Sequence, residues 1–220
     1  MKKNTSVIIM GDIVKSRQAA ELKKLHQIFN GVVDDVNRGF RRCINSPLTI
    51  TLGDEFQGIV SSLLMGIKIA TKVRMDLLSK GVESRLVVGL AQIQTQVNKS
   101  KAWNMMGPGL SEARQVLNDK EDFNCYRFSL PSLNKEVPLL LNGLGRALTN
   151  VENHWTPTQM KYVTRAIDSE KTMANLAKDL KISKNTLFKV LRSGEFQLYI
   201  QQRNTIEEVL KLLDQEQGLA

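Results

Sequence analysis

Apolar and polar positions alternate along the first 130 residues in a way that predicts strands and helices in turn. Residues 5–14 are a nearly continuous apolar run, as expected of a strand that is buried on both faces. Residues 18–40 then place apolar side chains at steps of three and four, the spacing of a helix with one face against a core. The same patterns predict strands at 48–52, 56–60, 84–93 and 126–128, and helices at about 62–79 and 110–118.

Taken in order, these segments read β-α-β-β-α-β-α-β. That order predicts an α+β fold of the ferredoxin-like type, with a central antiparallel sheet and helices on one face. The pattern changes after Pro131, and from Thr156 onward it is helical, without the alternation typical of strands. We therefore expect three parts: residues 1–130 with the sheet, a helical or mixed connector at 131–155, and an all-α domain at 156–220.

Residues 173–191 have the apolar pattern of a helix-turn-helix. Leu176, Ala177 and Leu180 are placed to pack the first helix, and Ser183 is placed to cap the second. Polar side chains near the start of such a second helix can reach base edges, while basic ones meet phosphate. The side chains expected on its outer face, and so at DNA, are Lys184, Asn185, Thr186, Lys189 and Arg192.

Two alternatives to DNA binding stay open for this half of the chain. It could be a small helical bundle that binds protein, or one that only caps the first domain. The closing helix predicted at 195–213 carries enough apolar positions to serve either packing or homodimer formation.

The chain carries a net charge of +9, and most of that charge lies in its first part. Residues 1–150 contain 21 Lys and Arg against 13 Asp and Glu, whereas residues 151–220 contain 10 against 9. A basic surface suits the phosphates of nucleotides or of nucleic acid, although it also serves solubility alone.

Composition excludes several other classes of protein. No apolar run approaches the roughly 20 residues of a membrane span, and we expect neither a membrane segment nor a signal peptide. Cys43 and Cys125 lack metal-ligand spacing, so we expect two reduced thiols in a cytoplasmic protein, with a lone disulfide as the alternative. Because His26 and His154 are the only histidines, any metal would be Mg²⁺ or Mn²⁺ on oxygen ligands.

Two acidic residues follow or interrupt the predicted strands at comparable points. Asp12 lies after Gly11 near the end of the first strand, and Asp54 lies after Gly53 in a predicted hairpin. Carboxylates on neighbouring strands could share a divalent cation, and the turn after the first strand could hold phosphate. The alternative is that both segments are ordinary turns, in which Gly and Asp are common. The candidate phosphate-binding residues are Ile13, Val14, Lys15, Ser16, Arg17 and Arg114.

These segments resemble the metal-binding motifs of class III nucleotidyl cyclases, and the second also resembles the Gly-Gly-Asp-Glu-Phe hairpin of diguanylate cyclases. The resemblance covers about residues 5–128 and implies a cyclase palm-like domain. It implies metal binding by Asp12 and Asp54, and a triphosphate wrapped by the turn at 13–17. The motifs that carry it are Gly11-Asp12-Ile13-Val14-Lys15-Ser16, Leu52-Gly53-Asp54-Glu55-Phe56, Arg85-Leu86-Val87-Val88-Gly89-Leu90 and Gly107-Pro108-Gly109-Leu110-Ser111-Glu112-Ala113-Arg114.

The last motif departs from the cyclase pattern at the two positions that act on the transition state. Ser111 takes the place of the cyclase Asn, and Gln115 takes the place of the cyclase Arg. Arg114 comes one residue early, about 100° around the helix from the required direction. Nucleotide and metal binding are therefore expected more strongly than cyclase turnover.

The whole chain, with a cyclase-like first part and a helix-turn-helix second part, resembles the SatD family of small bacterial proteins. Our leading hypothesis is a cytoplasmic DNA-binding transcription regulator whose first domain binds a nucleotide with Mg²⁺ or Mn²⁺. The alternatives are an active metal-dependent nucleotidyl cyclase or transferase, and a purely structural interaction domain.

Overall fold

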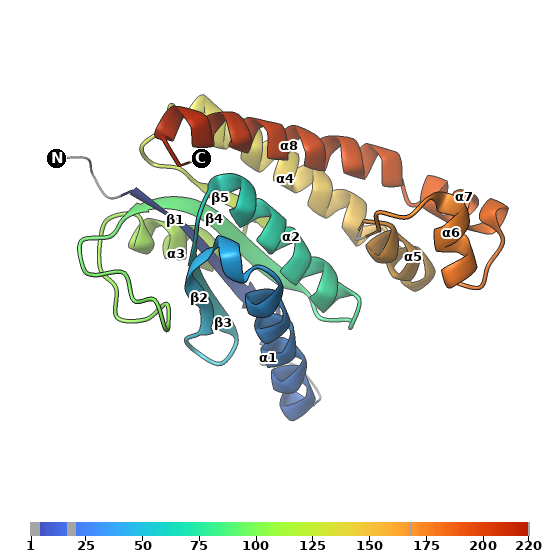
Figure 1. Ribbon diagram of the computed structural model, residues 1–220, viewed down its shortest axis with the longest axis horizontal. Helices are drawn as coiled ribbons and strands as arrows, with labels where there is room; N and C mark the ends of the chain where they lie inside the picture. Colours follow the sequence, from blue (N-terminus) through green and yellow to red (C-terminus); the bar gives the residue numbers. More distant parts are fainter. Residues whose placement is uncertain (1–4, 17–20, 168, 220) are drawn as a thin grey trace.

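A computed structural model describes residues 5–16, 21–167 and 169–219 of the chain (Figure 1). Its strands are β1 (Thr5–Ile13), β2 (Ile44–Ile50), β3 (Glu55–Val60), β4 (Ser84–Gln92) and β5 (Tyr126–Ser129). Its helices are α1 (Leu22–Gly39), the short 3-10 helix η2 (Arg41–Cys43), α2 (Leu63–Leu78), α3 (Leu110–Asn118), α4 (Glu136–Asn153), α5 (Pro157–Ile167), α6 (Met173–Asp179), α7 (Lys184–Ser193) and α8 (Phe196–Gln217).

The strands form one sheet in the order β2-β3-β1-β4-β5. Strand β1 is central and runs antiparallel to both β3 and β4, and β2 and β3 are also antiparallel. This arrangement confirms the predicted ferredoxin-like α+β core. Strand β5 adds a parallel edge beside β4, because the connection between them includes α3 and crosses over the sheet.

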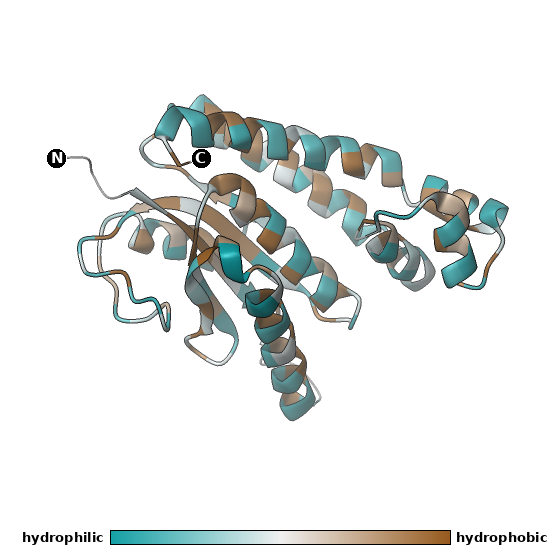
Figure 2. Ribbon diagram, in the orientation of Figure 1, coloured by the Kyte–Doolittle hydropathy of each residue, from teal (hydrophilic) through white to brown (hydrophobic). Residues whose placement is uncertain are grey.

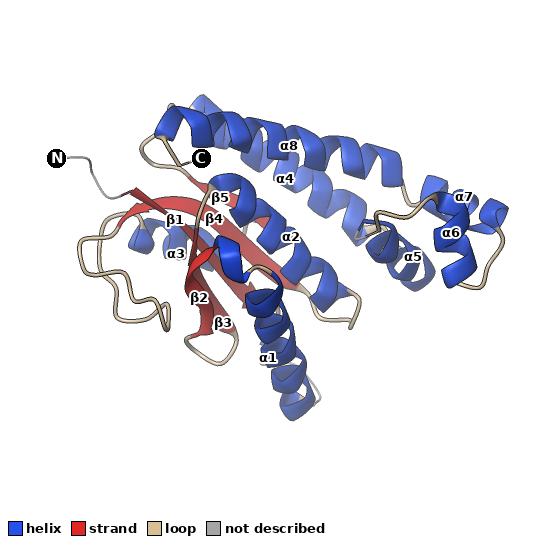
Figure 3. Cartoon of the chain, viewed as in Figure 1, coloured by secondary structure: helices blue, strands red, loops and turns tan. Residues whose placement is uncertain are grey.

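Helices cover both faces of the sheet, which corrects our expectation that they lie on one face. Successive side chains of β1 point to opposite faces. Val7 and Ile9 belong to the large core that includes residues of α1, α2, α4 and α8. Ile8 and Met10 belong to a smaller core with Ala113 of α3. Figure 3 shows α1 and α2 lying across the sheet.

The end of the chain returns to the sheet domain and caps one of its helices. Asp214 of α8 is buried, and its carboxylate accepts hydrogen bonds from the backbone N–H groups of Leu63 (2.7 Å) and Leu64 (2.9 Å). These N–H groups open α2 and have no partner within the helix. The negative charge also suits the positive end of the helix dipole. Helix α8 therefore stabilises the first turn of α2.

The segment between the sheet and the helix-turn-helix is mainly α4, which packs against β5 and α8. Helices α4 and α8 lie side by side along one edge of the molecule, with α5, α6 and α7 at one end (Figure 1). The large apolar core runs without a break from the sheet into these helices. Figure 2 shows the apolar residues of the strands lying under the helices.

Helices α6 and α7 form the predicted helix-turn-helix. Thr172 caps α6 by accepting a hydrogen bond from the N–H of Asn175, and Ser183 caps α7 by accepting one from Thr186. Leu176 and Ala177 of α6 are buried, as are Leu187 and Leu191 of α7. Helix α5 packs against α7, so the second helix is held on its inner side and open on its outer side.

Candidate functional site

Asp12 lies near the end of β1, opposite Glu55 of β3 and Arg85 of β4. It is 9% exposed, and the alternation along β1 places it on the same face as Met10, the face that α3 covers. Arg85 donates two hydrogen bonds to its carboxylate, from Nε to Oδ1 (3.0 Å) and from Nη2 to Oδ2 (2.6 Å). This paired geometry fixes the Asp12 carboxylate and balances its charge.

Asp54 lies in the turn between β2 and β3 and joins that turn to the end of β1. Its backbone carbonyl accepts a hydrogen bond from the N–H of Ile13 (3.0 Å), and its carboxylate accepts one from the hydroxyl of Ser16 (2.5 Å). The two acidic segments are therefore neighbours, as the sequence led us to expect.

The turn after β1 offers fewer free donors than the sequence indicated. The N–H of Ile13 is donated to Asp54, and the N–H of Val14 is donated to the carbonyl of Glu83 (2.9 Å). Lys15 is exposed and has a left-handed backbone (φ 55°), while Ser16 is half-buried. Because the Ser16 hydroxyl already donates to Asp54, Lys15 is the residue of this turn whose side chain is placed to meet a phosphate. The remaining candidate, Arg17, lies outside the described residues.

Glu55 adds a third carboxylate that our sequence reasoning gave no role. Burial raises the pKa of Glu55, Arg114 lowers it, and the charges of Asp12 and Asp54 raise it, so that it lies above its ordinary value. The carboxylates therefore repel one another, and a bound cation would relieve that repulsion. The signal that could have indicated Glu55 was its place directly after Asp54; the register between β1 and β3 then brings it opposite Asp12.

The donor set suits a hard divalent cation, because Mg²⁺ and Mn²⁺ prefer carboxylate oxygens. Within residues 5–16, 21–167 and 169–219, however, no three His, Cys, Asp or Glu side chains are grouped closely enough to hold a metal ion. Asp12 is engaged by Arg85 and Asp54 by Ser16. A cation held by Asp12 and Asp54 would therefore have to replace Arg85 at Asp12 and Ser16 at Asp54.

A pocket of about 560 Å³ lies on the same face of the sheet as the carboxylates. Arg114 lines it and donates a hydrogen bond from Nη2 to Oε1 of Gln57 (3.1 Å). Arg114 therefore reaches over β3 although it comes one residue before the cyclase position. Ser111 also lines the pocket, whereas Gln115 is exposed and does not. The lining residues are Met10, Thr51, Leu52, Gln57, Trp103, Asn104, Met105, Met106, Gly107, Leu110, Ser111 and Arg114.

The start of α3 is fixed by a close approach of backbone to backbone. Gly109 has a positive φ of 95°, and a Cβ atom there would lie 2.6 Å from the Cα of Ala91 in β4. Glu112 accepts hydrogen bonds from the N–H of Gly109 (2.5 Å) and from the hydroxyl of Ser111 (2.9 Å). These contacts set the helix against the sheet and aim Ser111 and Arg114 at the pocket.

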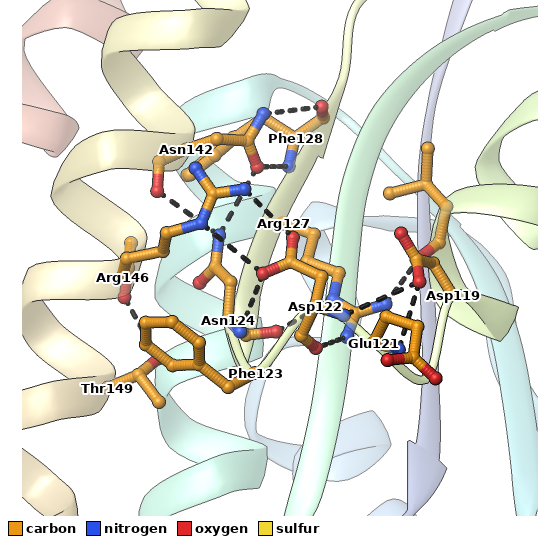
Figure 4. Close-up of polar contacts among 12 residues, drawn as sticks. Asp119, Glu121, Asp122, Phe123, Asn124, Arg127, Phe128, Asn142, Arg146 and Thr149 are labelled. Atoms are coloured by element: carbon orange, nitrogen blue, oxygen red, sulfur yellow. Dashed lines mark hydrogen bonds and ion pairs between the residues drawn. The ribbon is translucent and has the colours of Figure 1, made fainter.

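The end of α3 is held by a buried arginine of β5 (Figure 4). Arg127 is 1% exposed and donates hydrogen bonds to the backbone carbonyls of Val116 (2.5 Å) and Leu117 (3.1 Å). Carbonyls in the last turn of a helix lack partners within the helix and attract a cation. Asn142 of α4 in turn exchanges two hydrogen bonds with the backbone of Phe128, at 3.0 and 3.1 Å. Both ends of α3 are thus anchored to the sheet.

The outer face of α7 carries every residue that the sequence assigned to DNA. These residues are all exposed: Lys184, Asn185, Thr186, Lys189 and Arg192. The hydroxyl of Thr186 also shares a hydrogen bond with the Ser183 hydroxyl (2.8 Å), so it takes part in the cap. Phe188, which our sequence reasoning left out, is 60% exposed on the same helix. The indole of Trp155 anchors the far end of α7 at the carbonyl of Gly194 (2.8 Å).

Among the helices that the structure describes, none is both long and apolar enough to cross a membrane. No curated protein sequence matches the chain. A solved structure with a similar arrangement is that of a bacterial light-regulated adenylyl cyclase, with a TM-score of 0.43 and 9% sequence identity. That similarity covers 56% of this chain and 42% of the cyclase chain. The SatD family profile matches residues 6–210, which is nearly the full length. The chain therefore belongs to the SatD family.

Proposed function

We propose that this protein is a cytoplasmic DNA-binding transcription regulator, and that its sheet domain binds a nucleotide together with Mg²⁺ or Mn²⁺. The observation that carries the proposal is the outer face of α7, which is polar, basic and exposed while its inner face is buried. A second helix presented in this way is suited to lie in the major groove of DNA.

The basic and amide side chains on the outer face of α7 have roles at DNA that their chemistry supports. Lys184, Lys189 and Arg192 would bind phosphates, because ammonium and guanidinium groups release counterions there. Asn185 would read a base edge, since its amide offers both a donor and an acceptor. The caps and anchors at both ends of α7 hold these groups in a fixed arrangement.

The nucleotide half of the proposal rests on the carboxylates and on the cations beside them. Asp12 and Asp54 would hold the metal ion, whose charge would offset that of the phosphates. Lys15 at the turn and Arg114 at the pocket would meet the phosphates themselves. Both are exposed; Lys15 follows Asp12 by three residues, and Arg114 is close enough to Glu55 to lower the pKa of that carboxyl.

A chain of polar contacts connects this site with the helices that carry α7. Arg85, the partner of Asp12, directly follows Ser84, whose carbonyl accepts a hydrogen bond from Arg74. Arg74 also pairs with Glu152 of α4 (2.5 Å). A change at the Asp12–Arg85 pair would therefore act on the start of β4, which Arg74 and Glu152 connect to α4. We propose this route as the means by which a nucleotide alters DNA binding, either within one chain or in a homodimer.

DNA binding is tested by measuring, with fluorescence anisotropy, how the affinity for fragments of the source genome depends on salt concentration. Lys184→Ala and Lys189→Ala should each weaken binding and reduce the slope of log K against log salt by about one. Lys211→Ala, a change of another exposed lysine on α8, is the matched control and should leave the slope unchanged. Failure to bind any fragment, or equal slopes in all variants, would contradict the proposal.

The second candidate is an active nucleotidyl cyclase or transferase, which is favoured by the position of Ser111 and Arg114 at the pocket beside the carboxylates. Phosphoryl transfer needs a metal ion and positioned cations more than covalent help. Incubation with Mn²⁺ and each nucleoside triphosphate, followed by product analysis, separates the two functions. Product formation that the Asp54→Asn variant abolishes would establish the protein as an enzyme. A nucleotide that binds but gives no product would favour the regulator.

A further inference from the structure

We propose that the pocket beside the carboxylates binds the base of the nucleotide, with Trp103 as its stacking surface. This inference rests on the proposed nucleotide binding and adds where the base lies. We refer to the pocket as the Trp103 pocket; it has the twelve lining residues given above.

Strand register places the Trp103 pocket next to the acidic group. Met10 and Gln57, which line it, are directly opposite each other in β1 and β3. Asp12 and Glu55 are likewise opposite each other, two residues further along the same strands. Two residues of a strand span about 7 Å, and both pairs face the same side of the sheet. A base in the pocket would therefore leave its phosphates within reach of the carboxylates.

Several large apolar side chains in the wall of the Trp103 pocket are open to solvent. Trp103 is 59% exposed, and Met106 and Leu52 are each 69% exposed. Large apolar side chains grouped around a hollow indicate a surface that a ligand covers. An indole offers a flat face of the kind on which any base can stack.

The wall that carries Trp103 is held in place by hydrogen bonds to the neighbouring strands. Ala102 is fully buried, its N–H donates to the Thr49 hydroxyl (2.9 Å), and its carbonyl accepts from the Gln57 amide (2.5 Å). The hydroxyl of Ser46 donates to the carbonyl of Asn98 in the same loop (2.5 Å). The indole is therefore presented by a preorganised loop, which reduces the entropy lost on binding.

Polar groups at the Trp103 pocket suit a heteroaromatic ligand better than a purely apolar one. The side chain of Gln57 is oriented at both ends, since its amide donates to Ala102 and its carbonyl oxygen accepts from Arg114. Arg114 lines the pocket and also lowers the pKa of Glu55, so it is close to both the pocket and that carboxylate. It would meet the ribose or the first phosphate of a bound nucleotide. Ser111 and Thr51 add hydroxyl groups at the rim.

The test is to titrate the protein, in the presence of Mg²⁺, with each nucleoside triphosphate and with inorganic tripolyphosphate. Binding is detected by tryptophan fluorescence and by calorimetry. Trp155, the other tryptophan, is 7% exposed, so a change on ligand binding would report Trp103. Trp103→Ala should weaken nucleotide binding about tenfold and leave tripolyphosphate binding unchanged. Trp103→Phe should retain most of the affinity, and Phe123→Ala, a change of another exposed aromatic, is the control.

The outcomes separate this inference from the proposed function. Nucleotide binding that Asp54→Asn weakens but Trp103→Ala leaves unchanged would overturn the base pocket and keep the nucleotide site. If calorimetry detected binding of neither a nucleotide nor tripolyphosphate, both the base pocket and the proposed nucleotide site would be overturned. Selective loss of nucleotide affinity in Trp103→Ala, with tripolyphosphate unaffected, would establish the pocket.

Discussion

Replacing Glu152 by alanine would leave a buried guanidinium without its partner between the sheet and the helices. Arg74 is 1% exposed and Glu152 2% exposed, and Nε of Arg74 lies 2.5 Å from Oε2 of Glu152. The other carboxylate oxygen accepts hydrogen bonds from the phenols of Tyr126 (2.6 Å) and Tyr199 (2.9 Å). Strand β5, α2, α4 and α8 thus meet at one carboxylate.

The size of the effect follows from this burial. Burial lowers the pKa of Arg74, but the charge and hydrogen bond of Glu152, together with Cys125 and Tyr126, raise it by more, so the guanidinium is charged beside its partner. Breaking a buried ion pair by removing one member costs about 3–5 kcal/mol. Unfolding entropy is about 2.1 cal/mol/K per residue, or roughly 0.46 kcal/mol/K for 220 residues. Glu152→Ala should therefore lower the Tm by about 6–11 °C.

Thermal unfolding by circular dichroism and calorimetry provides the measurement. Glu216→Ala, which removes an exposed carboxylate of α8, is the control and should change the Tm by little. The double variant Arg74→Met with Glu152→Gln removes both charges and keeps an acceptor for the phenols, so it should be more stable than Glu152→Ala. A fall in Tm below about 2 °C for Glu152→Ala, or a double variant that is less stable than the single, would refute the reasoning.

Three further predictions concern caps, turns and titration. Ser183→Ala should cost about 1 kcal/mol through loss of the α7 cap, seen as faster amide exchange in α7; unchanged exchange would contradict it. Gly109→Ala should lower the Tm more than Gly218→Ala, because both have positive φ but only Gly109 meets the β4 backbone; equal effects would count against this account. Burial raises the pKa of Tyr126 and Tyr199 well above 10, and the charge of Glu152 raises it further. The stability that these two neutral phenols contribute should thus be retained below pH 10 and lost as the pH rises above 10. In an ultraviolet titration, two of the three tyrosines should form phenolate only when the protein unfolds. Phenolate formation by all three in the folded protein would be inconsistent with this prediction.

Much of the fold could be predicted because its signals are local. The continuous apolar run of β1 and the stripe of α1 follow directly from side-chain spacing. Spacing does not say which face of a sheet a helix covers, and α3 lies on the face that we did not expect. Arg74 and Glu152 are far apart in the sequence, so nothing local indicated that they form a buried pair.

The candidate site was predictable to the level of segments. The acidic segments around Asp12 and Asp54 lie together because the end of β1 pairs with the start of β3, which Asp54 directly precedes. The bidentate contact from Arg85 was not evident, since it depends on the register between β1 and β4. Trp103 lies in a loop without periodicity, so its place at the pocket follows only from the three-dimensional structure.

The most direct test of the proposed function is the affinity for DNA with and without a saturating Mg²⁺–nucleoside triphosphate, at one salt concentration. If the sheet domain controls α7, the Kd for DNA should change by about fivefold or more. Asp54→Asn should abolish that change, whereas Lys184→Ala should weaken DNA binding in both states and keep their ratio. The nucleotide used is one that calorimetry has shown to bind the protein. If the Kd for DNA were then the same with and without that nucleotide, the account would be contradicted.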